Sequence, residues 1–183
     1  MQSFPRKKLA VAPSVAVLPF IDGSDNGALA NFCEGFAEEV LDALRKVQAL
    51  RVSSRMTAFH LDASKVDPRE VGRKLKVQAQ LKGSVRKSDD RLHVDIDFIE
   101  TKEGTKLWTK QYIKPLNEIF HIQEDIFNSI TKTMDVPAKF TDVATHHDVK
   151  PKAYDLFLHG LSCFAKHTTQ DNVYARQLFK QTI

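Results

Sequence analysis

The sequence of 183 residues is long for one small domain and short for two large ones, so one domain with an appendage is expected. Hydrophobic residues make up 42% of the chain and charged residues 27%, proportions that exclude collagen-like, low-complexity and wholly disordered proteins. The formal net charge of +4 is mildly basic and identifies no class of partner by itself.

The first third of the chain predicts a strand, a helix and a second strand. Residues 14–20 are apolar on both faces, which is typical of a strand covered on both sides. A turn-rich loop, residues 21–27, leads into an amphipathic helix over residues 28–47, and residues 50–54 form a short second strand. This order implies a right-handed parallel crossover.

The middle of the chain predicts a short helix and an antiparallel meander. Asp67 precedes Pro68, and Glu70 follows three residues after Asp67, which is a strong signal for a helix that ends near Lys76. From residue 77 to residue 113, apolar and polar residues alternate through three strands joined by short turns. Gly83, inside the first of these strands, predicts a bulge or a close backbone approach.

The last third is helical in pattern. Asn117 is the expected cap of a helix that ends before Pro137, and residues 138–150 read as a linker. Two amphipathic helices are expected at about residues 151–167 and 170–183. The pattern continues to Ile183 without a cap or breaker, so we expect this sequence to be part of a longer protein.

The pattern resembles a known family over residues 14–134. The residues that carry the resemblance are Val15–Phe20, Phe32, Glu34–Phe36, Glu39, Val52, Arg55, Ala58, Phe59, Asp67, Arg69, Gly72, Leu75, Val77, Leu81, Gly83–Arg86, Arg91, Val94, Ile99, Gly104, Leu107, Trp108, Glu118–Phe120 and Ile122–Glu124. They resemble the TolB amino-terminal-like α/β domain. Residues 153–160, together with Ala175, Leu178 and Phe179, resemble the first hairpin of a tetratricopeptide array, although further repeats are missing.

The resemblance and the patterns together predict the domain organisation. Residues 1–13 are expected to be a linker, 14–136 the TolB amino-terminal-like domain, 137–151 a second linker, and 152–183 a truncated tetratricopeptide-like helical hairpin. The predicted fold class is α/β: a five-stranded mixed sheet, made of a parallel pair and an antiparallel meander, with helices packed on it. The resemblance implies an accessory, non-catalytic module of bacterial proteins that carry nucleotide cyclase, DNA-binding or kinase domains.

A candidate ligand site follows from the two parallel strands. Their carboxyl ends should lie on one rim of the sheet, where open α/β sheets bind ligands. Ser24, Asn26, Ser54 and Arg55 would then converge on a small polar or anionic ligand. The alternative is that Arg55 pairs with a nearby carboxylate, such as that of Asp22 or Glu34, and ties the loops together.

Other reactive residues have simpler interpretations. Asp95 and Asp97 fit a solvated strand face, the adjacent His146 and His147 lack the spacing of a helical zinc pair, and neither Cys33 nor Cys163 lies in a motif that marks a nucleophile. Trp108 is expected to pack between sheet and helix. No metal, cofactor or catalytic residue is therefore predicted.

The predicted function is a binding and coupling module of a bacterial signalling protein such as an adenylate cyclase, with a protein partner or self-association. The alternatives are a stand-alone small-ligand-binding domain and a dimerisation platform. Basic clusters at residues 6–8, 45–51 and 69–76 alternate with acids and lack a recognition motif, so nucleic-acid binding is not favoured. No membrane segment is evident in the sequence, and the expected location is the cytoplasm, or the periplasm if the parent protein has an upstream membrane span.

Overall fold

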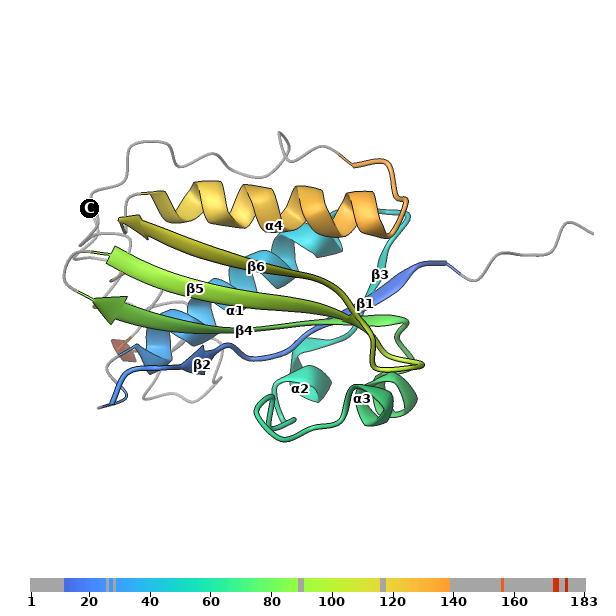
Figure 1. Ribbon diagram of the computed structural model, residues 1–183, viewed down its shortest axis with the longest axis horizontal. Coiled ribbons are helices and arrows are strands. Elements are labelled where there is room, and N and C mark those ends of the chain that lie inside the picture. The colour runs from blue at the N-terminus through green and yellow to red at the C-terminus, as the bar shows by residue number, and fades with distance from the viewer. Residues whose placement is uncertain are drawn as a thin grey trace, which may run out of the picture.

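The computed structural model describes residues 12–138, except 26, 28, 89, 90, 116 and 117, and beyond them only residues 156, 173, 174 and 177. Within this part the protein is an α/β domain with one six-stranded mixed sheet and four helices (Figure 1). The strands are β1 (Ser14–Val17), β2 (Ile21–Asp22), β3 (Arg51–Val52), β4 (Ala79–Ser88), β5 (Arg91–Glu100) and β6 (Lys106–Pro115). The helices are α1 (Ala30–Arg45), α2 (Arg55–Ala58), α3 (Pro68–Leu75) and α4 (Ile119–Thr133).

The sheet joins a parallel half to an antiparallel half, as predicted. The strand order is β3-β1-β4-β5-β6, in which β1 runs parallel to both β3 and β4. Val15 lies opposite Val52 on one side and Ala79 on the other. β4, β5 and β6 form the antiparallel meander. β4 is therefore the strand at which the two halves meet.

The strand count corrects the prediction of five, because the chain after Pro19 returns to the sheet. Leu18 donates its amide hydrogen to Leu81, and the chain pairs again with β4 as β2, in which Ile21 lies opposite Ser84. Proline cannot donate a hydrogen bond to a ladder, so the pairing is interrupted around it. β1 and β2 thus form one interrupted strand along β4.

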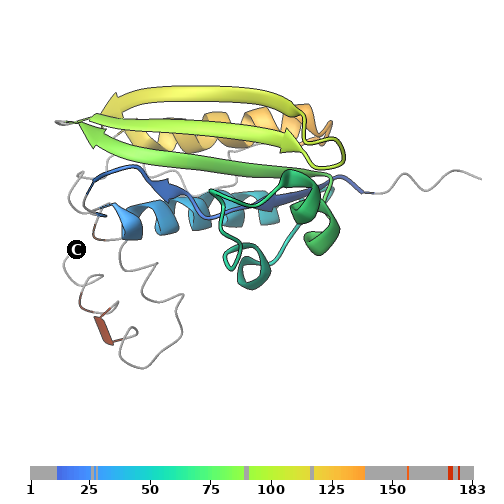
Figure 2. The same cartoon turned by 60° about the horizontal axis from the view of Figure 1, so that its bottom comes forward.

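Helices cover the two faces of the sheet unequally. α1 and α4 lie together on one face, where they bury the main core with the inward side chains of β1, β4 and β5. α2 and α3 cover the other face only near β1 and the β5–β6 turn (Figures 1 and 2). Val15 and Val17 belong to the main core and Ala16 and Leu18 to the smaller cluster, which confirms that β1 is buried on both sides.

Two local predictions are also confirmed. The Asp67 side chain accepts a hydrogen bond from the Arg69 amide at the start of α3, and Pro68 occupies the first turn. Gly83 lies where backbones approach closely, because a Cβ atom there would come within 2.8 Å of the Asp95 carbonyl oxygen and 3.2 Å of the Phe20 ring.

Several predictions fall outside the described residues. These are the Asn117 cap, all but the last two residues of the linker of residues 1–13, all but the first two residues of the linker of residues 137–151, and the helical hairpin of residues 152–183 as an element. α4 itself begins at Ile119 and ends at Thr133, before Pro137, as expected. In the part of the chain that is described, none of the helices is long and apolar enough to cross a membrane.

Candidate functional site

Arg55 stands at a corner between α1 and α2, where it pairs with two carboxylates of α1. Its Nη2 donates to Glu34 Oε1 at 2.6 Å, and its Nε donates to Glu38 Oε1. The guanidinium also lies 4.9 Å from the centre of the Phe59 ring. Ser54 caps α2 by accepting a hydrogen bond from the Thr57 amide. This is the ion-pair arrangement named as the alternative to a ligand site, with Glu38 as an additional partner.

Glu38 is the unusual member of this corner because its side chain is only 12% exposed. Burial raises the pKa of the Glu38 carboxyl to about 7, although the positive charge of Arg55 and its hydrogen bond act in the opposite direction. Glu34 and Asp42 add a smaller upward effect through charge repulsion. The Arg55 corner therefore holds α2 against α1 through a carboxylate that titrates near neutral pH.

Ser24 lies in a separate loop. The Asp22 carboxylate accepts hydrogen bonds from the Ser24 amide at 2.8 Å, from the Ser24 hydroxyl, and from the Leu29 amide at 2.7 Å. Partial burial acts to raise the pKa of Asp22, but these hydrogen bonds outweigh it and hold that pKa below its usual value. Asp22 thereby closes the loop that leads into α1.

The structure brings Ser54 and Arg55 together but sets Ser24 apart from them. Ser24 follows β2, whose last residue, Asp22, pairs with Val85 of β4. Ser54 follows β3, and the register of β3 with β1 places Ser53 beside Ala16. Ala16 pairs with Gln80 of β4, and Gln80 and Val85 are five residues apart, which corresponds to roughly 16 Å at about 3.3 Å per residue. Asn26 lies outside the described residues. Ligand binding by this set remains a prediction from the sequence.

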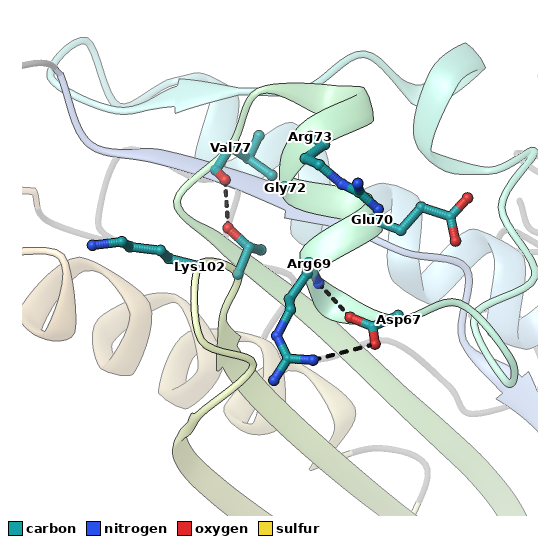
Figure 3. A pocket seen from close by; sticks show the side chains of 8 residues that line it. Asp67, Arg69, Glu70, Gly72, Arg73, Val77 and Lys102 are labelled. Atoms are coloured by element: carbon teal, nitrogen blue, oxygen red, sulfur yellow. Dashed lines mark hydrogen bonds and ion pairs between the residues drawn. The ribbon is translucent and has the colours of Figure 1, made fainter.

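A pocket lies between α3 and the β5–β6 turn, away from the Arg55 corner and the Ser24 loop, and we call it the α3 hollow (Figure 3). Its volume is about 670 Å³. It combines three basic side chains, two acidic ones and a small apolar floor. The lining residues are Asp67, Arg69, Glu70, Gly72, Arg73, Val77, Thr101 and Lys102.

Close packing of α3 on the turn shapes the floor of the α3 hollow. A Cβ atom on Gly72 would lie 2.7 Å from the Thr101 side chain, so only glycine allows this approach. The Thr101 hydroxyl donates to the Val77 carbonyl oxygen at 2.6 Å (Figure 3). Thr101 also donates its amide hydrogen to Gln78. These two hydrogen bonds hold the β5–β6 turn against residues 77 and 78, which follow α3.

Two buried polar side chains beneath α2 and α3 lack hydrogen-bond partners in the described structure. They are the hydroxyl of Ser53 and the amide of Gln80, which are 7% and 0% exposed. The strand register places both of them beside Ala16, on the face that α2 and α3 cover. In a strand with alternating apolar and polar residues, a polar residue such as Gln80 is expected on the solvated face, but the covering helices bury it.

The open part of the same sheet face carries a smaller hollow of about 260 Å³, lined by Lys82, Ser84, Asp95 and Asp97 among others. Burial acts to raise the pKa of Asp97, but hydrogen bonds from Thr109 and Lys106 outweigh it and lower that pKa. Both aspartates are half-buried on a polar strand face. Within the described ranges, no three histidine, cysteine or acidic side chains are grouped so that they could hold a metal ion.

The remaining candidates pack as the sequence suggested. Cys33 is 1% exposed in the main core, and burial raises the pKa of its thiol to about 12. The Trp108 ring lies 5.2 Å from that of Phe98, and its Nε1 donates to Thr133 of α4 at 3.0 Å. His146, His147 and Cys163 lie outside the described residues. The sequence identified Asp67 as the cap of α3 and residues 69–76 as a basic cluster, but it did not indicate that several of these residues line a pocket.

Comparison with known proteins gives one distant relative and a fold. No family model matches the chain. It is 28% identical over 182 residues to a protein of Rhizobium meliloti (strain 1021) named "Putative adenylate cyclase 3". That similarity covers 98% of this chain but only 31% of the relative, so the relative is about three times as long.

Among solved structures, the chain is similar to TolB from Acinetobacter baumannii, with 15% identity and a TM-score of 0.53. The similarity covers 70% of this chain and 30% of TolB. A second similar structure is the lipoprotein GNA1162 from Neisseria meningitidis, with 14% identity, 64% of this chain covered, 96% of the other and a TM-score of 0.48. The likeness to TolB supports the predicted fold, and at this identity it supports the fold alone.

Proposed function

We propose that this chain is a non-catalytic binding and coupling region of a larger bacterial signalling protein, of the kind that carries a nucleotide cyclase domain. The observation that carries the proposal is the similarity to the adenylate cyclase-named relative, which spans nearly all of this chain and under a third of the relative. A segment that is similar over its whole length to part of a longer protein is best understood as one of that protein's regions.

The geometry of the domain is compatible with such a role. The chain enters the described body at β1 and leaves it after α4, and both points lie at the same end of the sheet (Figures 1 and 2). A domain with adjacent entry and exit can be carried between two neighbours in one chain without separating them. The ionic groups of the Arg55 corner are used to hold helices together, which suits a scaffold.

The proposal includes the domain boundaries expected from the sequence. Residues 14–136 would form the TolB amino-terminal-like domain, residues 1–13 and 137–151 the linkers, and residues 152–183 the start of a tetratricopeptide-like array. A protein partner would bind the domain or that array. A cytoplasmic location belongs to the same proposal, because a nucleotide cyclase domain uses ATP as its substrate.

Two experiments test the proposal. The purified chain, incubated with ATP and Mg²⁺ or Mn²⁺, should form no cyclic AMP. The full-length protein should form it, and replacing residues 14–136 by a flexible Gly/Ser linker of about 20 residues should change the rate or its regulation without abolishing catalysis. Cyclic AMP formation by the isolated chain would contradict the proposal, and so would a full-length protein whose activity is indifferent to the replacement.

The dimerisation platform is the alternative that the same material can test. Light scattering on the purified chain should give the mass of a monomer if the region couples neighbours within one chain. A concentration-independent dimer would favour the platform.

A further inference from the structure

We propose that the α3 hollow binds a phosphate-bearing small molecule through Arg69, Arg73 and Lys102, and that this ligand holds the α2–α3 segment down on the sheet. This inference goes beyond the coupling role, because it assigns a ligand class and a site.

The positive charges of the α3 hollow are available to a ligand. Neither the Arg73 guanidinium nor the Lys102 ammonium group has a hydrogen-bond or ion-pair partner within the described part of the chain. Arg69 is held at the edge of the hollow, where its Nη2 donates to the Glu103 carbonyl oxygen at 3.1 Å. Figure 3 shows that Arg69 and Arg73 come from α3, whereas Lys102 comes from the turn on the opposite side and its exposed side chain extends away from both arginines.

The acidic residues of the α3 hollow are already engaged. Asp67 caps α3 through the Arg69 amide at 2.8 Å, and its other oxygen lies 3.8 Å from the Arg69 guanidinium. Glu70 pairs with Lys74 at 2.6 Å. When Lys74 is counted with the lining residues, positive charges exceed negative ones by two. This excess matches the dianion of a phosphate ester, whereas a single carboxylate needs only one arginine.

The size of the α3 hollow favours more than a bare anion. Its volume of about 670 Å³ lies within the range of small-molecule sites, roughly 300–1,000 Å³. Gly72 and Thr101 provide a floor without a bulky side chain. A sugar or nucleoside portion would therefore have room beside the phosphate group.

A second, independent observation indicates what such a ligand does. The α2–α3 segment rests on a small cluster in which most side chains are alanine or valine, and it buries Ser53 and Gln80 without hydrogen-bond partners. Each buried polar group left without a partner favours the opened form, in which water can reach it, by about tenfold. The free energy of local opening is therefore expected to be lower for the α2–α3 segment than for the main core. A ligand that contacts Arg73 of α3, and toward which the exposed Lys102 side chain of the turn reorients, would stabilise the closed position of this segment.

Hydrogen exchange measured by mass spectrometry on the purified chain tests the site and its consequence together, with inorganic pyrophosphate and a nucleoside monophosphate as probes. We expect saturating probe to slow exchange in residues 55–75 by about tenfold, with no change in α1 or α4. The double variant Arg73→Ala/Lys102→Ala should bind at least tenfold more weakly and lose this protection. Lys82→Ala, which removes a lysine from the other hollow on the same sheet face, should bind like the wild type.

A further pair of variants separates the orphaned amide from the ligand. Gln80→Leu should slow exchange in residues 55–75 without any probe and should still bind pyrophosphate. Gln123→Leu is the matched control, because Gln123 is also buried, at 6% exposed, but donates to Glu39 on the opposite face of the sheet. It should leave exchange in residues 55–75 unchanged.

Three outcomes would overturn the inference: unchanged binding in the double variant, no effect of saturating probe on residues 55–75, or binding of an acidic peptide but of neither phosphate probe. Because the isolated chain is used and cyclic AMP is not measured, these outcomes are distinguishable from a failure of the proposed function.

Discussion

Replacing Glu38 by glutamine should remove a pH dependence of stability that the Arg55 corner introduces. In the folded protein the pKa of Glu38 is about 7, whereas its usual value is 4.5. The folded state therefore binds this proton more tightly than the unfolded state does. Glu38 contributes its full stabilisation below about pH 4.5, and that contribution is lost as the pH rises through 7.

The size of the effect follows from the same two values. A difference of this size corresponds to about 3 kcal/mol of unfolding free energy, because one pKa unit is worth 1.36 kcal/mol. The carboxylates of Asp22, Asp97 and Asp125 have lowered pKa values and act in the opposite direction, but mostly below about pH 4. The fall caused by Glu38 is therefore separated from them in pH.

Urea unfolding followed by the fluorescence of Trp108, repeated between about pH 4 and pH 8, measures this effect. The stability difference between wild type and Glu38→Gln should change by about 3 kcal/mol across that range. Glutamine keeps an oxygen for the Arg55 Nε, so the corner stays paired. Asp42→Asn removes an exposed carboxylate one turn along α1 and should reduce the wild-type fall only slightly, because Asp42 makes the smallest contribution to the raised pKa of Glu38. A pH-independent difference between wild type and Glu38→Gln would refute the reasoning.

Three further substitutions test packing and capping. Trp108→Ala should lower the unfolding free energy by about 3 kcal/mol, because the ring stacks on Phe98. Trp108→Phe should lower it much less. Equal losses of stability in thermal unfolding would contradict the packing role. Gly83→Ala should cost about 1–3 kcal/mol, because its Cβ atom would meet a β5 carbonyl oxygen at 2.8 Å, while the neighbouring Ser84→Ala should be nearly neutral in urea unfolding. Asp67→Ala should cost about 1 kcal/mol by removing the α3 cap, and Asp67→Asn should retain most of it; a neutral alanine variant would argue against the cap.

The sequence predicted those parts of the fold that depend on local pattern. Apolar residues on both faces predicted that β1 is buried on both sides. The Asp67 cap and the alternation through β4 and β5 are likewise visible within a few residues of sequence. The alternation identified the face on which Gln80 lies. It could not identify what covers that face, because α3 reaches it through tertiary packing.

The candidate site was harder to predict because its geometry depends on distant residues. β2 has only two residues, too few to show a period, and its pairing with β4 carries Ser24 away from Arg55. The Arg55 partners lie 17 and 21 residues earlier in the chain, on successive turns of α1. Glu34 was named because it is near the expected rim, but the burial that distinguishes Glu38 exists only after α2 has docked.

The position of β4 between the two halves of the sheet also implies an order of assembly. Short turns join β4, β5 and β6 of the meander. By contrast, β1 pairs with β4 only when the chain between Val15 and Ala79 closes into a long loop. Closing the longer loop costs more chain entropy before any contact repays it, so we expect the meander to form early and the parallel strands to join late. The helices α2 and α3 lie within that late-closing loop. We therefore expect these two helices to dock late in folding and to be released early in unfolding.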